Sequence, residues 1–191
     1  MPCEGEACSI RPITELWTGA RWKLEPLPLP AGAAAGNPVL TAVSWSPRRF
    51  CVAVGGYALG SGCATPGEGA CNPSTIAERW DGQRWYEMST PRGVGALSAV
   101  SCASSTACTA VSRATDCIAE LNAASACLGL GGAVIAGWNG RGWSLESTPT
   151  VPRAVHPPIL SAVSCASAQA CTAVGSYLQS ATSMFAPLAE G

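Results

Sequence analysis

The sequence predicts an all-β protein built from copies of one sheet-forming unit. The first observation is a run of small and β-branched residues that is nearly identical at 97–112 and 160–175 and occurs in altered form at 40–55. The second is a Trp-x-Gly-x-x-Trp motif, which starts at Trp17, Trp80 and Trp138. The third is that no apolar pattern with the helical period runs beyond about two turns. Such repetition is typical of proteins that stack identical supersecondary units.

Each copy of the first run is expected to form a β-hairpin. The middle copy has stretches of small and β-branched residues at 97–102 and 108–112, on either side of a small polar turn. Such stretches around a turn are typical of two paired antiparallel strands. In the second and third copies, cysteines stand on both sides of the turn, where a bridge would clamp the strands.

The tryptophan motif predicts a second hairpin in each unit. Asp-Gly and Asn-Gly between β-prone flanks are strong signals for a tight hairpin turn. With a two-residue turn, Trp80 would pair with Gln83, and Glu78 with Trp85. Both indoles would then project from the same face as diagonal neighbours. Large rings on one face of a four-stranded sheet suit the packing of one sheet against the next.

The order of the two hairpins along the chain predicts how the sheets are divided. The chain starts with the tryptophan hairpin of a unit and ends with the first hairpin of a unit. We therefore expect four-stranded antiparallel sheets at 39–90, at 96–149, and at 159–191 completed by 1–30. The N- and C-terminal parts would share this last sheet. About three such blades in a β-propeller-type arrangement would be an open fragment, an unusually small ring, or half of a homodimer with six blades.

Residues 50–92 resemble a kelch repeat. They carry the run Val52-Ala53-Val54-Gly55-Gly56-Tyr57, then Glu78-Arg79-Trp80-Asp81, then Trp85 and Pro91-Arg92. The double glycine is absent after the other two hairpins, and cysteine-bridged hairpins are more similar to secreted bacterial repeat proteins. The resemblance implies a β-propeller that binds ligands through loops on one face. It implies no catalytic residue.

Composition argues against two classes of partner. Hydrophobic residues make up 48% of the 191 positions, charged residues make up 12%, and the net charge is −1. A chain without a basic stripe has little with which to attract phosphates, so we expect no nucleic-acid partner. No apolar run approaches the roughly 20 residues of a membrane helix, so we expect no membrane insertion.

The 11 cysteines predict an oxidising compartment and therefore a secreted protein. The start Met-Pro-Cys-Glu-Gly-Glu does not look like a signal peptide, so we expect the signal to be absent from this chain. No Cys-x-x-Cys occurs and there is one histidine, so we expect no metal site and no cofactor. Aligning the copies predicts five local disulfides: Cys3–Cys8, Cys63–Cys71, Cys102–Cys108, Cys117–Cys127 and Cys165–Cys171. Cys51 is left alone because Trp45 stands opposite it, and we expect a buried thiol or, as the weaker alternative, an intermolecular bridge.

No catalytic set is assembled by the sequence. Glycosidases need two facing carboxylates, and nothing in the sequence brings a specific pair together. The candidates are Glu68, Glu78, Asp116 and Glu120. His156 lies in a proline-rich connection and is expected to face solvent. Six of the seven tryptophans belong to the repeated pairs, which favours core packing over stacking on sugars. A ligand is better sought in the variable loops, where Ser61, Glu68, Asp116 and Glu120 are the candidate contacts.

These observations leave three hypotheses for the function. The first is a secreted, non-catalytic binding or interaction module for a protein or carbohydrate ligand. The second is the propeller domain of a carbohydrate-active enzyme, similar to a glycosidase or sialidase. The third is a structural repeat segment of a larger surface protein. The absence of an assembled catalytic set favours the first.

Overall fold

The structure is a computed structural model. It describes residues 11–46, 50–58, 73–92, 94–112, 133–152, 154, 158–179 and 184–190. Its elements are β1 (Thr14–Trp17), β2 (Trp22–Glu25), the short 3-10 turn η1 (Ala33–Ala35), β3 (Val39–Ser46), β4 (Phe50–Ala58), β5 (Pro73–Trp80), β6 (Trp85–Glu87), β7 (Leu97–Ser104), β8 (Ala107–Ser112), β9 (Ile135–Trp138), β10 (Trp143–Glu146), β11 (Ile159–Ser167), β12 (Ala170–Gln179) and β13 (Met184–Glu190). The described part of the chain is therefore all-β, as predicted.

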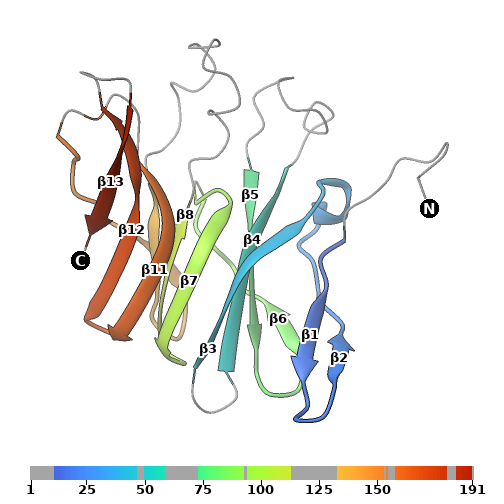
Figure 1. Cartoon of the computed structure of the whole chain (residues 1–191). Coiled ribbons are helices and arrows are strands. Elements are labelled where there is room, and N and C mark those ends of the chain that lie inside the picture. Colours follow the sequence, from blue (N-terminus) through green and yellow to red (C-terminus); the bar gives the residue numbers. More distant parts are fainter. Residues whose placement is uncertain are drawn as a thin grey trace.

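The strands form four antiparallel sheets. Sheet A is the hairpin β1–β2, sheet B has the order β3-β4-β5-β6, sheet C has the order β7-β8-β9-β10, and sheet D has the order β11-β12-β13. In Figure 1 the sheets stand in a row, with sheet D at one end, sheet C next, then sheet B, and sheet A at the other end. The row is open, and no closed propeller is formed by the described strands.

The first hairpin of each unit has the predicted register. Cys102 lies opposite Cys108, Cys165 lies opposite Cys171, and Trp45 lies opposite Cys51. All three hairpins also share a β-bulge, which follows Leu40, Leu97 and Leu160. A bulge inserts one extra residue into a strand and turns it out of the ladder. In this chain the extra residue carries a hydroxyl group in every copy.

The bulge residues link neighbouring sheets. Thr41 Oγ1 donates a hydrogen bond of 2.6 Å to the carbonyl oxygen of Leu97, and Ser98 Oγ donates one of 2.9 Å to that of Leu160. A second repeated link runs in the opposite direction. The backbone N–H of Cys102 donates to Ser44 Oγ, and that of Cys165 donates to Ser101 Oγ, each at 2.9 Å. The same two bonds therefore join sheet B to sheet C and sheet C to sheet D.

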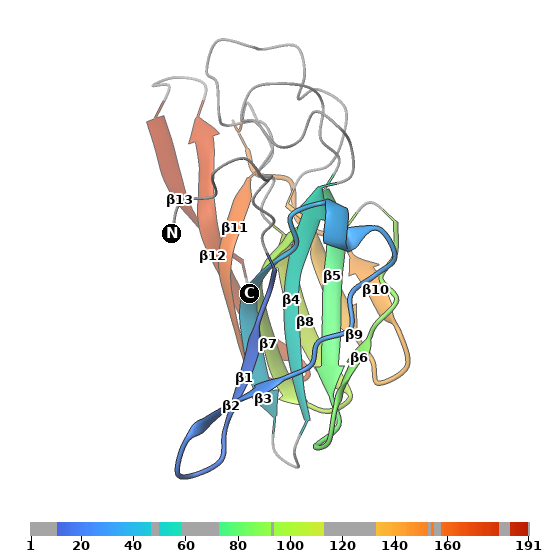
Figure 2. The same cartoon turned by 90° about the vertical axis from the view of Figure 1, so that its right-hand side faces the viewer.

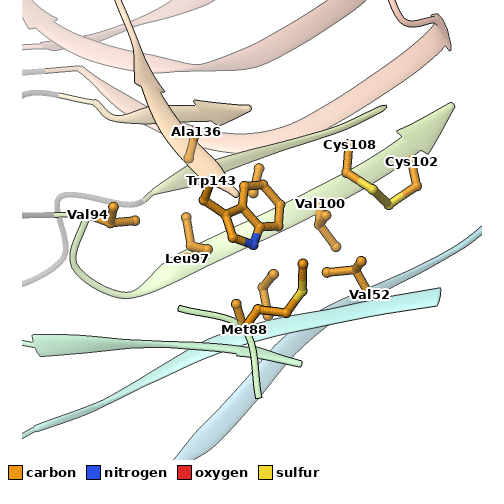
Figure 3. Close-up of a cluster of buried hydrophobic side chains, with 12 residues drawn as sticks. Val52, Met88, Val94, Leu97, Val100, Cys102, Cys108, Ala136 and Trp143 are labelled. Carbon is orange, nitrogen blue, oxygen red and sulfur yellow. A yellow bond between two sulfur atoms is a disulfide. The ribbon is translucent and has the colours of Figure 1, made fainter. Parts of the chain in front are cut away.

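Apolar side chains fill the space between the linked sheets. Val52 of β4 faces Val100 and Trp143 of sheet C in the larger cluster (Figure 3), to which Val54 also belongs. The opposite face of sheet C packs on sheet D through a smaller cluster, whose buried members are Val111, Ala133, Leu160 and Ala173. Sheet C is thus covered on both faces and contributes residues to both hydrophobic clusters.

Close backbone contact at the bulge explains two of the glycines. A Cβ atom on Gly55 would overlap the carbonyl oxygen of Val39, and one on Gly175 would overlap that of Ile159. The same position in sheet C holds Ser112, whose N–H and Oγ both bond to the backbone of Val134. The double glycine of the kelch-like run is therefore a packing requirement in sheet B.

The expected pairing of the tryptophan hairpins is wrong. Trp80 lies opposite Trp85, and Glu78 lies opposite Glu87, because the turn has four residues. The Asp81 carboxylate accepts hydrogen bonds from the N–H groups of Gln83 and Arg84, and this Asx-type turn holds the wider loop. Asn139 Oδ1 likewise accepts from the N–H groups of Arg141 and Gly142, and Thr18 Oγ1 accepts one such bond, from the N–H of Arg21. The indoles still share a face, at centroid distances of 5.5 to 5.9 Å.

The expectation that 159–191 shares a sheet with 1–30 is also wrong. β13 pairs with β12 from Ala173 to Gln179, while β1 and β2 pair with each other. Closing a hairpin within 170–190 requires a much shorter loop than bringing in the N-terminal segment, so its entropic cost is lower. The strand was hard to foresee because Pro187 lies inside it, and proline is tolerated only at a sheet edge, where β13 lies.

Tryptophan packing differs between the units. Trp80 and Trp143 are buried, as predicted, with 4% and 7% of their surface exposed. Trp17 and Trp22 of sheet A are 51% and 62% exposed, contrary to the prediction of core packing. Figures 1 and 2 place sheet A beside sheet B, on the side away from sheet C. Trp143 lies in the cluster between sheets B and C, whereas Trp17 and Trp22 belong to neither of the two clusters of the described residues.

Candidate functional site

The most distinctive polar pair in the described part of the chain lies on β5 and β6. Glu78 and Glu87 are direct cross-strand neighbours, so both side chains leave the same face of sheet B. Like charges placed directly opposite one another destabilise a sheet when both are ionised. One of the two carboxyl groups is therefore expected to keep its proton.

Burial decides which group that is. Glu78 is fully buried, and neither of its carboxyl oxygens has a hydrogen-bond partner. Burial, with a smaller contribution from the charge of Glu87, raises the pKa of Glu78 to about 8. Glu78 is thus a neutral acid at pH 7, while Glu87 lies at the surface. A carboxylic acid held neutral beside a second carboxyl group is an arrangement that general acid–base chemistry uses.

A groove of about 350 Å³ runs beside this pair, along the strand ends of sheet B and the connection from β6 to β7. Glu87 and Arg92 contribute charge to its wall, and Tyr57, Ser74 and Thr90 contribute hydroxyl groups. Glu78 does not line the groove. The wall can therefore hydrogen-bond a polar ligand, but only one of the two carboxyl groups reaches it.

A second hollow of about 120 Å³ lies between sheets C and D at the turn ends of their first hairpins. Its wall includes Trp138 and Glu146 from sheet C, and Cys165, Ala168 and Cys171 from sheet D. The carboxyl group of Glu146 folds over Gly137, where a Cβ atom would collide with it. Among the described residues, those that line the hollow come from sheets C and D and their turns, and none comes from β13.

The cysteines that the structure describes are structural. Cys102–Cys108 and Cys165–Cys171 form the predicted disulfides. Cys51 is a free, buried thiol, and burial raises its pKa to about 12. A thiol with so high a pKa is a poor nucleophile, which agrees with the expectation of a core residue. Within the described residues, no three metal-ligating side chains gather at one place.

All four ligand contacts predicted from sequence, Ser61, Glu68, Asp116 and Glu120, lie outside the described residues. So do His156, which was expected to face solvent, and the predicted disulfides Cys3–Cys8, Cys63–Cys71 and Cys117–Cys127. Of the carboxylates named from sequence, the structure places Glu78. Sequence reasoning missed its partner Glu87, because a two-residue turn put Trp85 in that place. Recognising the side-chain-bonded turn at Asp81 would have found the pair.

Comparison of the chain with protein families, with curated proteins and with solved structures gave no match. Among the described residues, no helix is both long and apolar enough to cross a membrane.

Proposed function

We propose that this chain is a secreted, non-catalytic binding module of the β-propeller type. The observation that carries the proposal is the position of the strand ends that flank its variable segments. The ends of β4, β8 and β12 lie at one rim of the row of sheets, as do the starts of β5 and β13 (Figure 1). These strand ends are the described residues next to 59–72, 113–132 and 180–183 in the sequence. Binding residues are often carried on loops that a rigid scaffold positions together.

The scaffold beneath this rim is suited to hold such loops. Repeated intersheet hydrogen bonds join sheets B, C and D, and two disulfides close the first hairpins of sheets C and D. Disulfides persist in oxidising compartments, which supports a secreted protein. In the sequence, the candidate contacts Ser61, Glu68, Asp116 and Glu120 lie in the segments that follow β4 and β8. Their mixed hydroxyl and carboxylate chemistry suits a carbohydrate or a polar protein surface.

The test is a binding screen with matched loop variants. The chain is applied to a glycan array, and its affinity for each glycan that binds is then measured by calorimetry. Replacing 113–132 with a short Gly-Ser linker should abolish binding while the far-UV circular dichroism keeps its β-sheet signature. Replacing Leu145, an exposed residue away from the rim, with Ser serves as the control. Binding that survives the removal of both 59–72 and 113–132 contradicts the proposal.

The alternative is a carbohydrate-active enzyme, and the Glu78–Glu87 pair favours it. Retaining and inverting glycosidases use one protonated and one ionised carboxyl group. Against it, Glu78 does not line the groove and so has no route to a glycosidic oxygen. Chromogenic glycosides separate the two functions. Turnover that both Glu87→Gln and Glu78→Gln abolish would establish the enzyme and overturn the binding module.

A further inference from the structure

The two ends of the row carry complementary incomplete units. Sheet A is a tryptophan hairpin without a first hairpin, and sheet D is a first hairpin without a tryptophan hairpin. We propose that the chain associates head to tail. The hairpin of sheet A in one copy completes sheet D of a second copy, and the completed sheet packs on sheet B of the first. This proposal is independent of the ligand bound at the rim.

The head of the interface is the exposed tryptophan pair. Trp17 and Trp22 have the same ring geometry as Trp80 and Trp85, with centroids 5.5 Å and 5.6 Å apart. In sheets B and C the first tryptophan of the pair lies opposite a cysteine of the strand before it, Trp80 opposite Cys51 and Trp138 opposite Cys108. Trp17 has no such neighbour in its own copy. An exposed pair of indoles that keeps the ring arrangement of the buried pairs indicates a contact surface.

The tail of the interface is the start of the β12 edge. β13 pairs with β12 only from Ala173 onwards, so Cys171 and Thr172 have no outer partner among the described strands. By the register of sheet C, Trp17 of the first copy would lie opposite Cys171 of the second. In sheet C, Trp138 Nε1 donates to the carbonyl oxygen of Ser105. The residue that corresponds to Ser105 is Ala168, and Ala168 and Cys171 both line the open hollow of about 120 Å³.

The intersheet hydrogen bonds predict the rest of the contact. Ser161 and Ser164 correspond to Ser98 and Ser101, but both are exposed and neither bonds to another described sheet. Continuing the pattern, Ser161 Oγ of the second copy would donate to the carbonyl oxygen of Leu40 in the first. The N–H of Trp45 in the first copy would donate to Ser164 Oγ of the second. The established contacts between sheets B and C and between C and D would thus recur a third time.

Exposed apolar residues on β3 lie where the repeated contact between sheets would cover them. Val43 is 64% exposed, whereas Val100, its counterpart in sheet C, is 8% exposed in the core between sheets B and C. Trp45, beside Val43 on the same face, is also exposed. Sheet D of a second copy would cover both. The overlap with the edge strand is confined to Ala189 and Glu190 of β13, which pair with Val174 and Ala173 and would have to yield to β1.

The partner is a second copy of this chain because each copy carries both halves of the contact. A head-to-tail contact makes a ring if its rotation closes and a filament if it does not. Two copies would supply the six sheets of a closed ring. The occupant could instead be a further unit of the same kind in another chain, and the experiment below separates that outcome.

The test measures mass in solution by light scattering after gel filtration, with disulfides intact. The 191-residue chain should show twice its mass of 19.3 kDa. Trp17→Asp in the head or Ser164→Arg in the tail should each weaken association by at least about tenfold, as for central interface residues. Both positions are exposed in the single copy, so folding should be retained. Leu145→Asp, equally exposed but outside the contact, should associate like the parent.

Mixing the two defective variants gives the decisive result. Trp17→Asp keeps an intact tail and Ser164→Arg keeps an intact head, so the mixture should form a dimer at concentrations where neither variant does alone. Blue-shifted tryptophan emission, with Trp22 as the reporter, should accompany it. A parent chain that stays monomeric at every concentration overturns the proposal and leaves the rim as the binding surface. A dimer that neither variant weakens, or that mixing does not restore, also overturns it.

Discussion

Glu78 places an ionisable group where neither of its oxygens has a partner. Its pKa is raised from 4.5 to about 8, by burial and then by the charge of Glu87. The folded protein therefore holds a proton that the unfolded chain releases above about pH 4.5. The free energy of unfolding should fall as the pH rises from about 4.5 towards about 8, by up to about 1.4 kcal/mol per pH unit.

Glu78→Gln should remove this dependence, because glutamine does not titrate. Urea denaturation across that pH range measures the effect. Glu15→Gln is the matched control, since Glu15 holds the corresponding position in sheet A and is exposed. A Glu78→Gln variant that kept the parent slope would show that the carboxyl group is solvated or ionised in the folded protein.

Gly55 is a second position where a single added atom should change the stability of the protein. A Cβ atom there would overlap the carbonyl oxygen of Val39, and backbone cannot move aside as a side chain can. Gly55→Ala should lower the free energy of unfolding by at least about 2 kcal/mol, as overpacking does in well-packed interiors. Gly142→Ala, where a Cβ atom meets nothing within 4 Å, should change it little or raise it slightly. Chemical denaturation of both variants makes the comparison, and equal effects would contradict the close contact.

At the scale of elements, the bulge in each first hairpin turns a hydroxyl group towards the next sheet. Ser98 Oγ reaches Leu160 in sheet D and also lies 3.1 Å from the carbonyl oxygen of Val111 in its own sheet. Ser98→Ala should therefore cost about 1 kcal/mol, the usual contribution of one partly buried hydrogen bond. Ser161→Ala, at the corresponding exposed position, should cost nothing in a single copy. An equal loss of unfolding free energy at both positions in dilute protein would show that the hydroxyl group acts within its own hairpin.

The elements also show what the sequence could and could not predict. Aligning the copies predicts the repeated hairpins and the register that places Cys102 opposite Cys108. It also predicts that Trp45 takes the position of the first cysteine in the hairpin that lacks a disulfide. Local patterns suffice for these because both partners lie within a few residues of each other. The identity of Glu87 as the neighbour of Glu78 was missed, because it depends on a side-chain hydrogen bond in the turn.

Longer-range features escaped sequence reasoning for a different reason. The intersheet hydrogen bonds of Thr41 and Ser98 join residues more than 50 positions apart, and a serine in a strand gives no sign of its acceptor. β13 could not be predicted because Pro187 lies within it and proline argues against a strand. The exposure of Trp17 could not be read from its motif, since the same motif is buried at Trp80. Whether a repeated side chain is buried depends on which sheet stands beside it.

At the scale of the whole molecule, the buried apolar residues are distributed unevenly along the row of sheets. The cluster between sheets B and C contains twelve buried residues, whereas that between sheets C and D contains four. Sheet C contributes to both, while sheet D is covered on one face only. In a row of this kind, each sheet is stabilised chiefly by its immediate neighbours, as in repeat proteins.

Local unfolding should therefore begin at sheet D. Native-state hydrogen exchange at low protein concentration should show the strongest protection in β4 and β8, and markedly weaker protection in β11 and β12. Leu160→Ala, in the smaller core, should speed exchange in sheet D while leaving β4 near its parent rate. Leu97→Ala, in the larger core, should speed exchange in sheets B, C and D together. Uniform protection across the three sheets, or a Leu160→Ala effect as large in β4 as in β12, would mean that the row unfolds as one cooperative unit.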